Sequence, residues 1–397
     1  MYVTEGKLKG QAVCLRFNAY VDDVFASFNA ESFYNAFMEA LTAYLRAGSN
    51  SGKNAISQSD DKDTYLSMKI EVLPDGAIKL QQKRYTIDVL HKFHHEDCKP
   101  ASTPFQSGIN LTKEMGPRNN AEREEMGGKP YSSLIGSLLH LARCTRPDIS
   151  TAVHICAQYQ SNPGLAHWKA ACYILRYLNG TRDRGLIYGR EVDGLPYCPC
   201  IGLCDSDYAS CLDDRRSRTG MIWLVWGGVV SWTSTKQTSV ALSSTEAEYM
   251  AACDAAKHGL WMTKLMDDLG YGDLHVQWGE KSEQERTGAK PLVILEDNQG
   301  AIEWSKGITD FKRAKHIDTR YHFLQEQVNW GNIKLGKIPT KENLADMMTK
   351  ALGPSTFIYH RDRTVPTGEE QYSISSLRNV NASCGYACAY AVFDPND

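Results

Sequence analysis

The most constraining feature of this chain is the order of patterns between residues 200 and 352. Apolar stretches, some of which end in acids, are followed there by helical patterns. "IGLCDSD" and "PLVILED" read as strands that run into carboxylates, and "RTGMIWLVWGGVVSWTS" reads as an apolar hairpin turned at Gly227-Gly228. Between them, "SSTEAEYMAACDAAKHGLWMTKLMDDLG" has the spacing of a long amphipathic helix with Ser and Thr caps. Strands and helices in this order predict a mixed α/β sheet.

Four acids of this region fall where such sheets place their functional sites. Asp205 ends the first strand, Glu248 lies in the first turns of the long helix, Asp297 follows "PLVILE", and Asp346 lies early in the expected last helix. A single acid at a helix start is ordinarily a solvated cap. Four together would repel one another unless they bound metal, and two divalent ions about 4 Å apart can activate a water for phosphodiester cleavage. The pattern therefore favours a metal site over four separate caps.

The upstream half has its own pattern. Residues 12 to 28 read as two strands joined by a turn with Asp22 and Asp23, adjacent acids that are costly to desolvate unless a cation compensates them. "TYLSMKIEVLPDGAIKLQQ" reads as a hairpin turned at Pro74-Asp75-Gly76, and "CKPASTPFQSG" as a Pro-rich linker. Residues 131 to 178 carry apolar residues at helical spacing, which predicts three helices.

Composition limits the partners and the compartment. The 397-residue chain has a net charge of −3, so nucleic acid would have to bind a local basic surface. Its first residues, "MYVTEGKLKGQAVCLRF", contain no long apolar core of a signal peptide, and no apolar run is long enough to span a membrane. We therefore expect an intracellular protein of the cytoplasm or nucleus, not secreted, with no membrane partner and with reduced cysteines.

The stretch "LCDSDYASCLDDRRSRTGMIWLVWGGVVSWTSTKQTSVALSSTEAEYMAACDAAKHGLWMTKLM" resembles the ribonuclease H domain of Ty1/copia-type retrotransposon polyproteins. "EDNQGAIEWSK", "RAKHIDTRYHFLQEQV" and "IPTKENLADMMTKAL" continue the resemblance in the same order. The resemblance implies a ribonuclease H-like mixed sheet with flanking helices, in an α/β fold. It also implies hydrolysis of the RNA strand of an RNA–DNA hybrid with two Mg²⁺ or Mn²⁺ ions. The catalytic and metal-binding residues that it implies are Asp205, Glu248, Asp297 and Asp346.

Neighbouring acids leave the register of this set slightly open. Asp207 could replace Asp205, and Glu246 could replace Glu248. The resemblance favours Asp205, which directly follows the strand, and Glu248, which is followed by an apolar helix face.

Two basic clusters near this region are candidates for nucleic-acid phosphates. Solvated charge runs are the ordinary alternative, and binding through such clusters would depend strongly on salt. The candidate residues are Arg215, Arg216, Arg218, Lys312, Arg313, Lys315, His316 and Arg320.

The resemblance extends upstream. "YLSMKIE" and "LQQKRYTIDVLHKF" are similar to the end of the same family's reverse transcriptase, and "YSSLIGSLLHLARCTRPDIS" is similar to the segment that joins it to ribonuclease H. "YVDD" then resembles the polymerase motif that binds metals through two aspartates, here Asp22 and Asp23. The family's third aspartate belongs to an earlier strand that is not in this sequence. We therefore expect a vestigial metal pair and the loss of RNA-directed DNA polymerase activity.

These readings give four parts. Residues 1–100 are expected to be a truncated reverse transcriptase with palm and thumb-like elements, 101–197 a linker and helical connection, 198–353 a ribonuclease H-like domain, and 354–397 an unassigned tail. The leading hypothesis is a metal-dependent RNA–DNA hybrid ribonuclease, partnered by the hybrid and by other retroelement polyprotein segments. The alternatives are a catalytically inactive nucleic-acid-binding remnant and a pseudogene product that does not fold stably.

Overall fold

The computed structural model describes residues 63–189, 200–225, 227–269, 291–307 and 318–368, with backbone only for 318–321. Nearer the N-terminus it gives the backbone of 2–8, 11–20, 23–28 and a few positions between 32 and 39. The chain divides into two compact units, Met1–Ile70 and Glu71–Asp397.

The first unit contains an antiparallel sheet in the order β1-β2-β3. Its strands are β1 (Tyr2–Leu8), β2 (Gln11–Tyr20) and β3 (Asp23–Phe28). Tyr20 at the end of β2 pairs with Asp23 at the start of β3, which confirms the two strands predicted within residues 12 to 28; the residues between them lie outside the described part of the chain. β4 (Thr64–Tyr65) pairs antiparallel with the first residues of β5 (Met68–Val72), and the division between the units falls within β5.

The second unit begins with the predicted turn between β5 and β6 (Ile78–Gln81). Oδ1 of Asp75 accepts the N–H of Ala77 at 3.1 Å, and Gly76 takes a φ of 82° that favours glycine. A helical segment follows, as predicted for residues 131 to 178, and ends at β7 (Gly185–Tyr188), which pairs antiparallel with β6. Its elements are α2 (Lys83–Lys92), η1 (Lys113–Met115), α3 (Asn120–Gly127), α4 (Tyr131–Cys144), η2 (Pro147–Ile149), α5 (Ser150–Ala157) and α6 (Leu165–Asn179).

A mixed five-stranded sheet forms the rest of this unit, in the order β10-β9-β8-β11-β12. Its strands are β8 (Ile201–Ser206), β9 (Arg218–Val225), β10 (Gly228–Lys236), β11 (Leu292–Glu296) and β12 (Ile333–Lys337). The first three pair antiparallel, whereas β8, β11 and β12 are parallel. The remaining elements are α7 (Ser244–Asp268), α8 (Gln299–Ser305), α9 (Asp318–Asn329), η5 (Thr340–Glu342), η6 (Leu344–Met348) and α10 (Pro354–Thr364). This arrangement confirms the mixed sheet with flanking helices that the resemblance implies.

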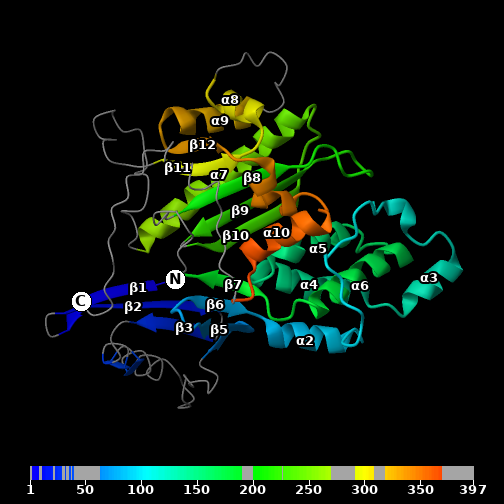
Figure 1. The fold of residues 1–397 in the computed structure, drawn as a ribbon, viewed down its shortest axis with the longest axis horizontal. Helices are drawn as coiled ribbons and strands as arrows, with labels where there is room; N and C mark the ends of the chain where they lie inside the picture. The colour runs from blue at the N-terminus through cyan, green and yellow to red at the C-terminus, as the bar shows by residue number, and fades with distance from the viewer. Residues whose placement is uncertain are drawn as a thin grey trace, which may run out of the picture. The chain divides into compact units, whose positions relative to one another are not determined.

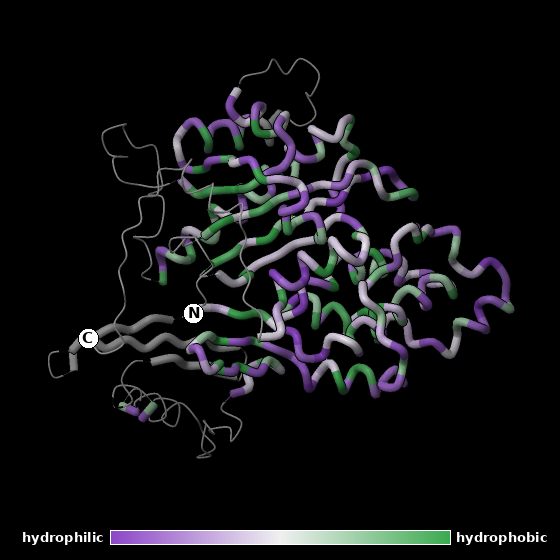
Figure 2. Tube along the Cα trace, in the orientation of Figure 1, coloured by the Kyte–Doolittle hydropathy of each residue, from purple (hydrophilic) through white to green (hydrophobic). Residues whose placement is uncertain are grey.

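Both faces of the five-stranded sheet are covered, since every residue of β8 and β9 is buried. In Figure 2 the central strands of this sheet, β8, β9 and β11, carry hydrophobic runs. On one face, a core forms with α7, α8 and α9, in which Trp223 and Tyr249 are fully buried. A Cβ on Gly202 would come within 2.7 Å of the Trp223 ring, so glycine at this position lets the indole pack flat against β8. Figure 1 shows α7 along this face and α5 and α10 on the other side.

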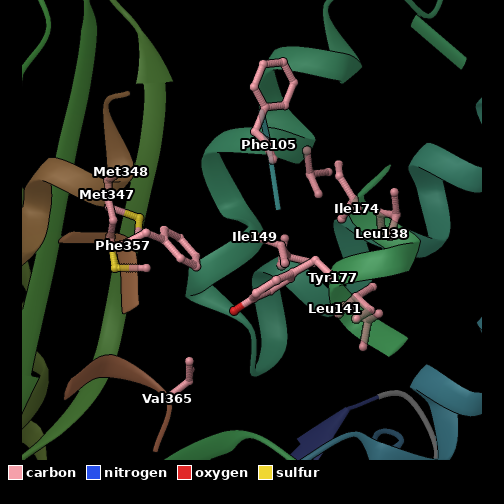
Figure 3. Close-up of a cluster of buried hydrophobic side chains, with 14 of the residues drawn as sticks. Phe105, Leu138, Leu141, Ile149, Ile174, Tyr177, Met347, Met348, Phe357 and Val365 are labelled. Atoms are coloured by element: carbon pink, nitrogen blue, oxygen red, sulfur yellow. The ribbon is translucent and has the colours of Figure 1, made fainter. Parts of the chain in front are cut away.

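The opposite face shares one hydrophobic core with the helical segment. Figure 3 shows Met347 and Phe357 on the sheet side facing Ile149 and Tyr177 of the helices. The rings of Tyr177 and Phe357 meet edge to face, with centroids 5.7 Å apart. This core crosses the predicted boundary at residue 198, so the predicted 101–197 and 198–353 segments pack together.

A buried ion pair anchors the helical side of this core. Arg146 is 1% exposed, and its Nε and Nη2 donate to the two carboxylate oxygens of Asp148 at 2.9 and 2.7 Å. Tyr177 donates its hydroxyl to the same carboxylate at 2.6 Å, and Thr181 O accepts from Nη1 of Arg146 at 3.0 Å. The network ties η2 to α6 with its charges compensated.

One expectation near the C-terminus needs correction. Asp346 lies on the five-residue 3₁₀ segment η6, not early in an α-helix. All five residues of η6 are buried and Asn343 joins it to β8 by donating to Cys204 O at 2.8 Å, so this segment has no solvent face like that of an amphipathic helix. The stretch from residue 354, which the sequence leaves unassigned, begins with α10. The buried residues of this helix are Phe357, His360 and Thr364, two of them polar.

Candidate active site

Three of the four predicted acids meet at the carboxyl ends of two parallel inner strands of the five-stranded sheet. Asp205 lies near the carboxyl end of β8 and Asp297 directly follows β11, and because these strands are parallel neighbours, both acids lie at the same end of the sheet. Glu248 comes from the first turns of α7, which is capped by Ser243. The nearest carboxylate oxygens of the three acids all lie within 4.8 Å of one another.

Burial makes the ionised forms of these acids costly. Asp205 is 2% exposed and Glu248 is 8% exposed. Desolvation, followed by the charge of Asp346, raises the pKa of Asp205 to about 7. Desolvation, followed by the charge of Glu296, raises the pKa of Glu248 to about 11. Without a cation, the folded site therefore retains protons that ordinary carboxylates lose well below neutral pH.

The donor set fits a divalent cation. Oε2 of Glu248 is buried, and within the described part of the chain it has no hydrogen-bond partner. An uncompensated carboxylate oxygen beside two further carboxylates matches the all-oxygen ligands of Mg²⁺ and Mn²⁺. Asp205, Glu248 and Asp297 could together hold such an ion.

The fourth acid, Asp346, approaches from η6 and is 5% exposed. Desolvation raises the pKa of its carboxyl group, although the ammonium of Lys350 opposes this shift. Nζ of Lys350 lies 2.8 Å from Oδ1 of Asp346 and 3.9 Å from Oδ2 of Asp205. Thr349 donates its hydroxyl to Oδ2 of Asp205 at 2.5 Å. The fourth acid thus joins the cluster through Asp205.

The two alternative acids have other partners. Asp207 accepts the N–H of Arg218 and the hydroxyl of Ser210. Oε2 of Glu246 accepts the N–H of Leu242 at 3.1 Å, in the loop that precedes α7. Both carboxylates therefore hold loop backbone, whereas Asp205 and Glu248 belong to the close group of three acids.

Two charged residues of the site are not among the sequence predictions. Glu296 is fully buried, accepts from Cys204 Sγ and from Asn298 N at 3.0 Å each, and has a pKa raised well above its usual value by desolvation. Successive side chains of a strand point to opposite faces of the sheet, so Glu296 and the following Asp297 are expected on different faces. This alternation could have indicated that Glu296 is buried on the α7 face. Lys350 follows Asp346 by four residues, a spacing at which charged side chains on a helical turn meet.

The predicted basic clusters differ in their exposure. Arg215 is exposed just after the turn at 212–214 and has a φ of 57°, and the side chain of Arg216 is 43% exposed. Arg218 is 5% exposed and its Nη1 donates to Ser234 O at 3.3 Å, so its guanidinium is not presented on the surface. Lys312, Arg313, Lys315 and His316 lie outside the described residues, and Arg320 lies on α9 without a described side chain.

The polymerase-like pair is only partly described. Asp23 begins β3 opposite Tyr20, whereas Asp22 lies outside the described residues. The role of Asp22 and Asp23 as a metal pair, and the loss of polymerase activity, stay predictions.

Among the described helices, none is both long and apolar enough to cross a membrane.

Comparison with solved structures gives only distant similarity. The LC11 ribonuclease H1 in complex with an RNA/DNA hybrid is 14% identical and covers 38% of this chain and 93% of its own, at a TM-score of 0.27. No protein-family model matches the chain.

Comparison with curated proteins is more informative. The Retrovirus-related Pol polyprotein from transposon TNT 1-94 of Nicotiana tabacum is 40% identical over 278 residues, 70% of this chain and 19% of that protein. The corresponding polyprotein from transposon RE2 of Arabidopsis thaliana is 32% identical over 340 residues, 85% of this chain and 21% of that protein. The Ty1-NL2 Gag-Pol polyprotein of Saccharomyces cerevisiae is 24% identical over 310 residues, 76% of this chain and 17% of that protein. The chain spans about a fifth of these relatives, and it belongs to the family of Ty1/copia-type retrotransposon polyproteins.

Proposed function

We propose that the five-stranded sheet domain hydrolyses the RNA strand of RNA–DNA hybrids in a metal-dependent reaction. The observation that supports this most is the convergence of Asp205, Glu248 and Asp297, from three separate elements, within 4.8 Å. Acids placed so closely repel one another, and their burial adds to that cost unless a cation compensates it. Membership of the retrotransposon polyprotein family supports the same reaction class.

The protein's own residues hold and prepare the site. Asp205, Glu248 and Asp297 would hold one Mg²⁺ or Mn²⁺ ion, and Asp205 with Asp346 would hold a second. When bound, the two ions would supply an activated water and charge stabilisation at the leaving oxygen. Because Asp205 and Glu248 have raised pKa values, they must release protons as they take up metal. Metal affinity should therefore rise with pH.

The hybrid would be held partly through its phosphates. Arg215 and Arg216 lie on the β8–β9 connection, which starts at the end of the strand that carries Asp205. Contacts of this kind position a duplex and make its affinity dependent on salt. The sequence adds the cluster from Lys312 to Arg320 as a further part of this surface. Other segments of the polyprotein remain proposed partners, and an intracellular location remains a prediction.

The test is cleavage of a labelled RNA–DNA hybrid by the full 397-residue chain, with Mg²⁺, Mn²⁺ or EDTA. We expect cleavage that EDTA abolishes, and its loss in Asp297→Asn and Glu248→Gln with hybrid binding retained. Asp268→Asn, at an exposed position at the end of α7, is the matched control and should cleave like the wild type. Binding without cleavage in the wild type would instead favour the inactive nucleic-acid-binding remnant.

A further inference from the structure

Lys350 places a positive charge between two buried acids. Its Nζ lies 2.8 Å from Oδ1 of Asp346 and 3.9 Å from Oδ2 of Asp205. The side chains of these acids are 7% and 3% exposed, whereas that of Lys350 is 44% exposed. The ammonium therefore reaches into the cluster from its open side, and it compensates the same pair of carboxylates that would hold a second divalent ion.

The backbone around Lys350 is held by other contacts. Thr349 Oγ1 donates to Asp205, and the hydroxyl of Thr151 on α5 donates to Met347 O at 2.6 Å. Asn343 fixes the other end of η6 to β8. The lysine side chain can therefore leave the acids by rotating about its own flexible bonds, without a movement of η6.

We propose that Lys350 is a built-in counterion that fills the Asp205–Asp346 side of the site and competes with the second divalent ion. This inference rests on the proposed metal-dependent function, and it concerns only the second of the two ions. Asp205, Glu248 and Asp297 would hold the first ion with the lysine still in place. Asp205 and Asp346 would hold the second only after the ammonium has swung out towards solvent, so the lysine lowers the apparent affinity of the site for that ion.

The first experiment titrates the full chain with Mn²⁺ or Mg²⁺ by calorimetry. Lys350→Met removes the charge at similar length, Lys350→Arg keeps it, and Lys264→Met makes the same change at an exposed position of α7. We expect the weaker of two ions to bind on the order of tenfold more tightly in Lys350→Met, because one cation no longer opposes another at close range. The stronger ion should change less, and both ions should bind to Lys264→Met as to the wild type.

The second experiment measures thermal unfolding with and without metal. In EDTA, Lys350→Met should unfold at a lower temperature than Lys264→Met, because Asp205 and Asp346 lose their counterion. Saturating Mg²⁺ should remove this difference, whereas a lysine that only packs against its neighbours would leave the difference in place. Lys350→Arg should behave like the wild type in both solutions.

Two results would overturn the inference. One is a second ion that binds Lys350→Met no more tightly than the wild type; the other is a stability loss that Mg²⁺ leaves unchanged. If the wild type still cleaves the hybrid, the proposed function survives either result. If no ion binds to any variant and no cleavage occurs, the proposed function fails together with the inference.

Discussion

Replacing Asp205 by Asn should stabilise the metal-free protein at neutral and alkaline pH while weakening its binding of metal. The pKa of Asp205 is raised from 3.8 to about 7 by desolvation and by Asp346. Since one pKa unit corresponds to about 1.4 kcal/mol, the ionised carboxylate costs the native state on the order of 4 kcal/mol. Asn carries no charge, and its side-chain oxygen can still accept the hydroxyl of Thr349. We expect a gain of about 1 to 4 kcal/mol; the raised pKa already includes the attraction to Lys350, and the lower figure allows for an amide that fits the hydrogen bonds of the carboxylate less well.

The pH dependence gives this prediction its sign. The folded pKa of Asp205 lies above the unfolded value, so the group has no effect below about pH 4, where both states bind the proton. The cost appears as pH rises from about 4 to about 7, and it is constant above that window. The advantage of Asp205→Asn should therefore grow across this window and then level off.

The assay is urea denaturation in EDTA, at about pH 4 and about pH 8, with Asp268→Asn as the exposed control. Mg²⁺ should raise the unfolding midpoint of the wild type at the higher pH and leave Asp205→Asn almost unchanged. A wild type that is at least as stable as Asp205→Asn in EDTA at about pH 8 would refute the reasoning from desolvation.

Three further outcomes test the packing around the site. Thr151→Val should lower the free energy of unfolding by about 1 to 3 kcal/mol and weaken metal binding, because Met347 O loses its buried donor. Thr151→Ser keeps the hydroxyl, so it should have the stability and the metal affinity of the wild type in denaturation and metal titrations. A fragment of residues 198–368 lacks the helices that cover one face of the sheet, so it should bind a dye for exposed apolar surface more strongly than a fragment of 71–368. Equal dye binding would show that the sheet domain folds alone. Arg146→Met should cost about 3 to 5 kcal/mol in denaturant titrations, because it leaves the buried charge of Asp148 unpaired.

The elements that could be predicted from the sequence are those whose pattern is local and strong. The helical spacing over 131 to 178 matches α4, α5 and α6, and the apolar hairpin turned at Gly227 matches β9 and β10. The meeting of Asp205 and Asp297 could also be expected, because each ends a buried strand and parallel neighbours end at the same edge.

The elements that could not be predicted depend on contacts between distant parts of the chain. η6 is buried at all five positions, so it has no periodicity that would mark it, and α10 buries His360 and Thr364, which an apolar pattern does not count. Sequence also gives the charge of a basic residue without its exposure, and for this reason Arg218 could not be distinguished from Arg215.

The core shared by the helices and the sheet also affects how the chain is made. The Thr151–Met347 contact joins residues 196 positions apart, so on a ribosome the helices emerge well before the turn that covers them. At about 5 to 20 residues per second, this interval is about 10 to 40 s. During that time the apolar faces of α5 and α6 that later contact η6 and α10 are open to other nascent chains. Expression in cells should therefore respond to holding chaperones that bind before residue 347 is synthesised, even when the finished protein is stable.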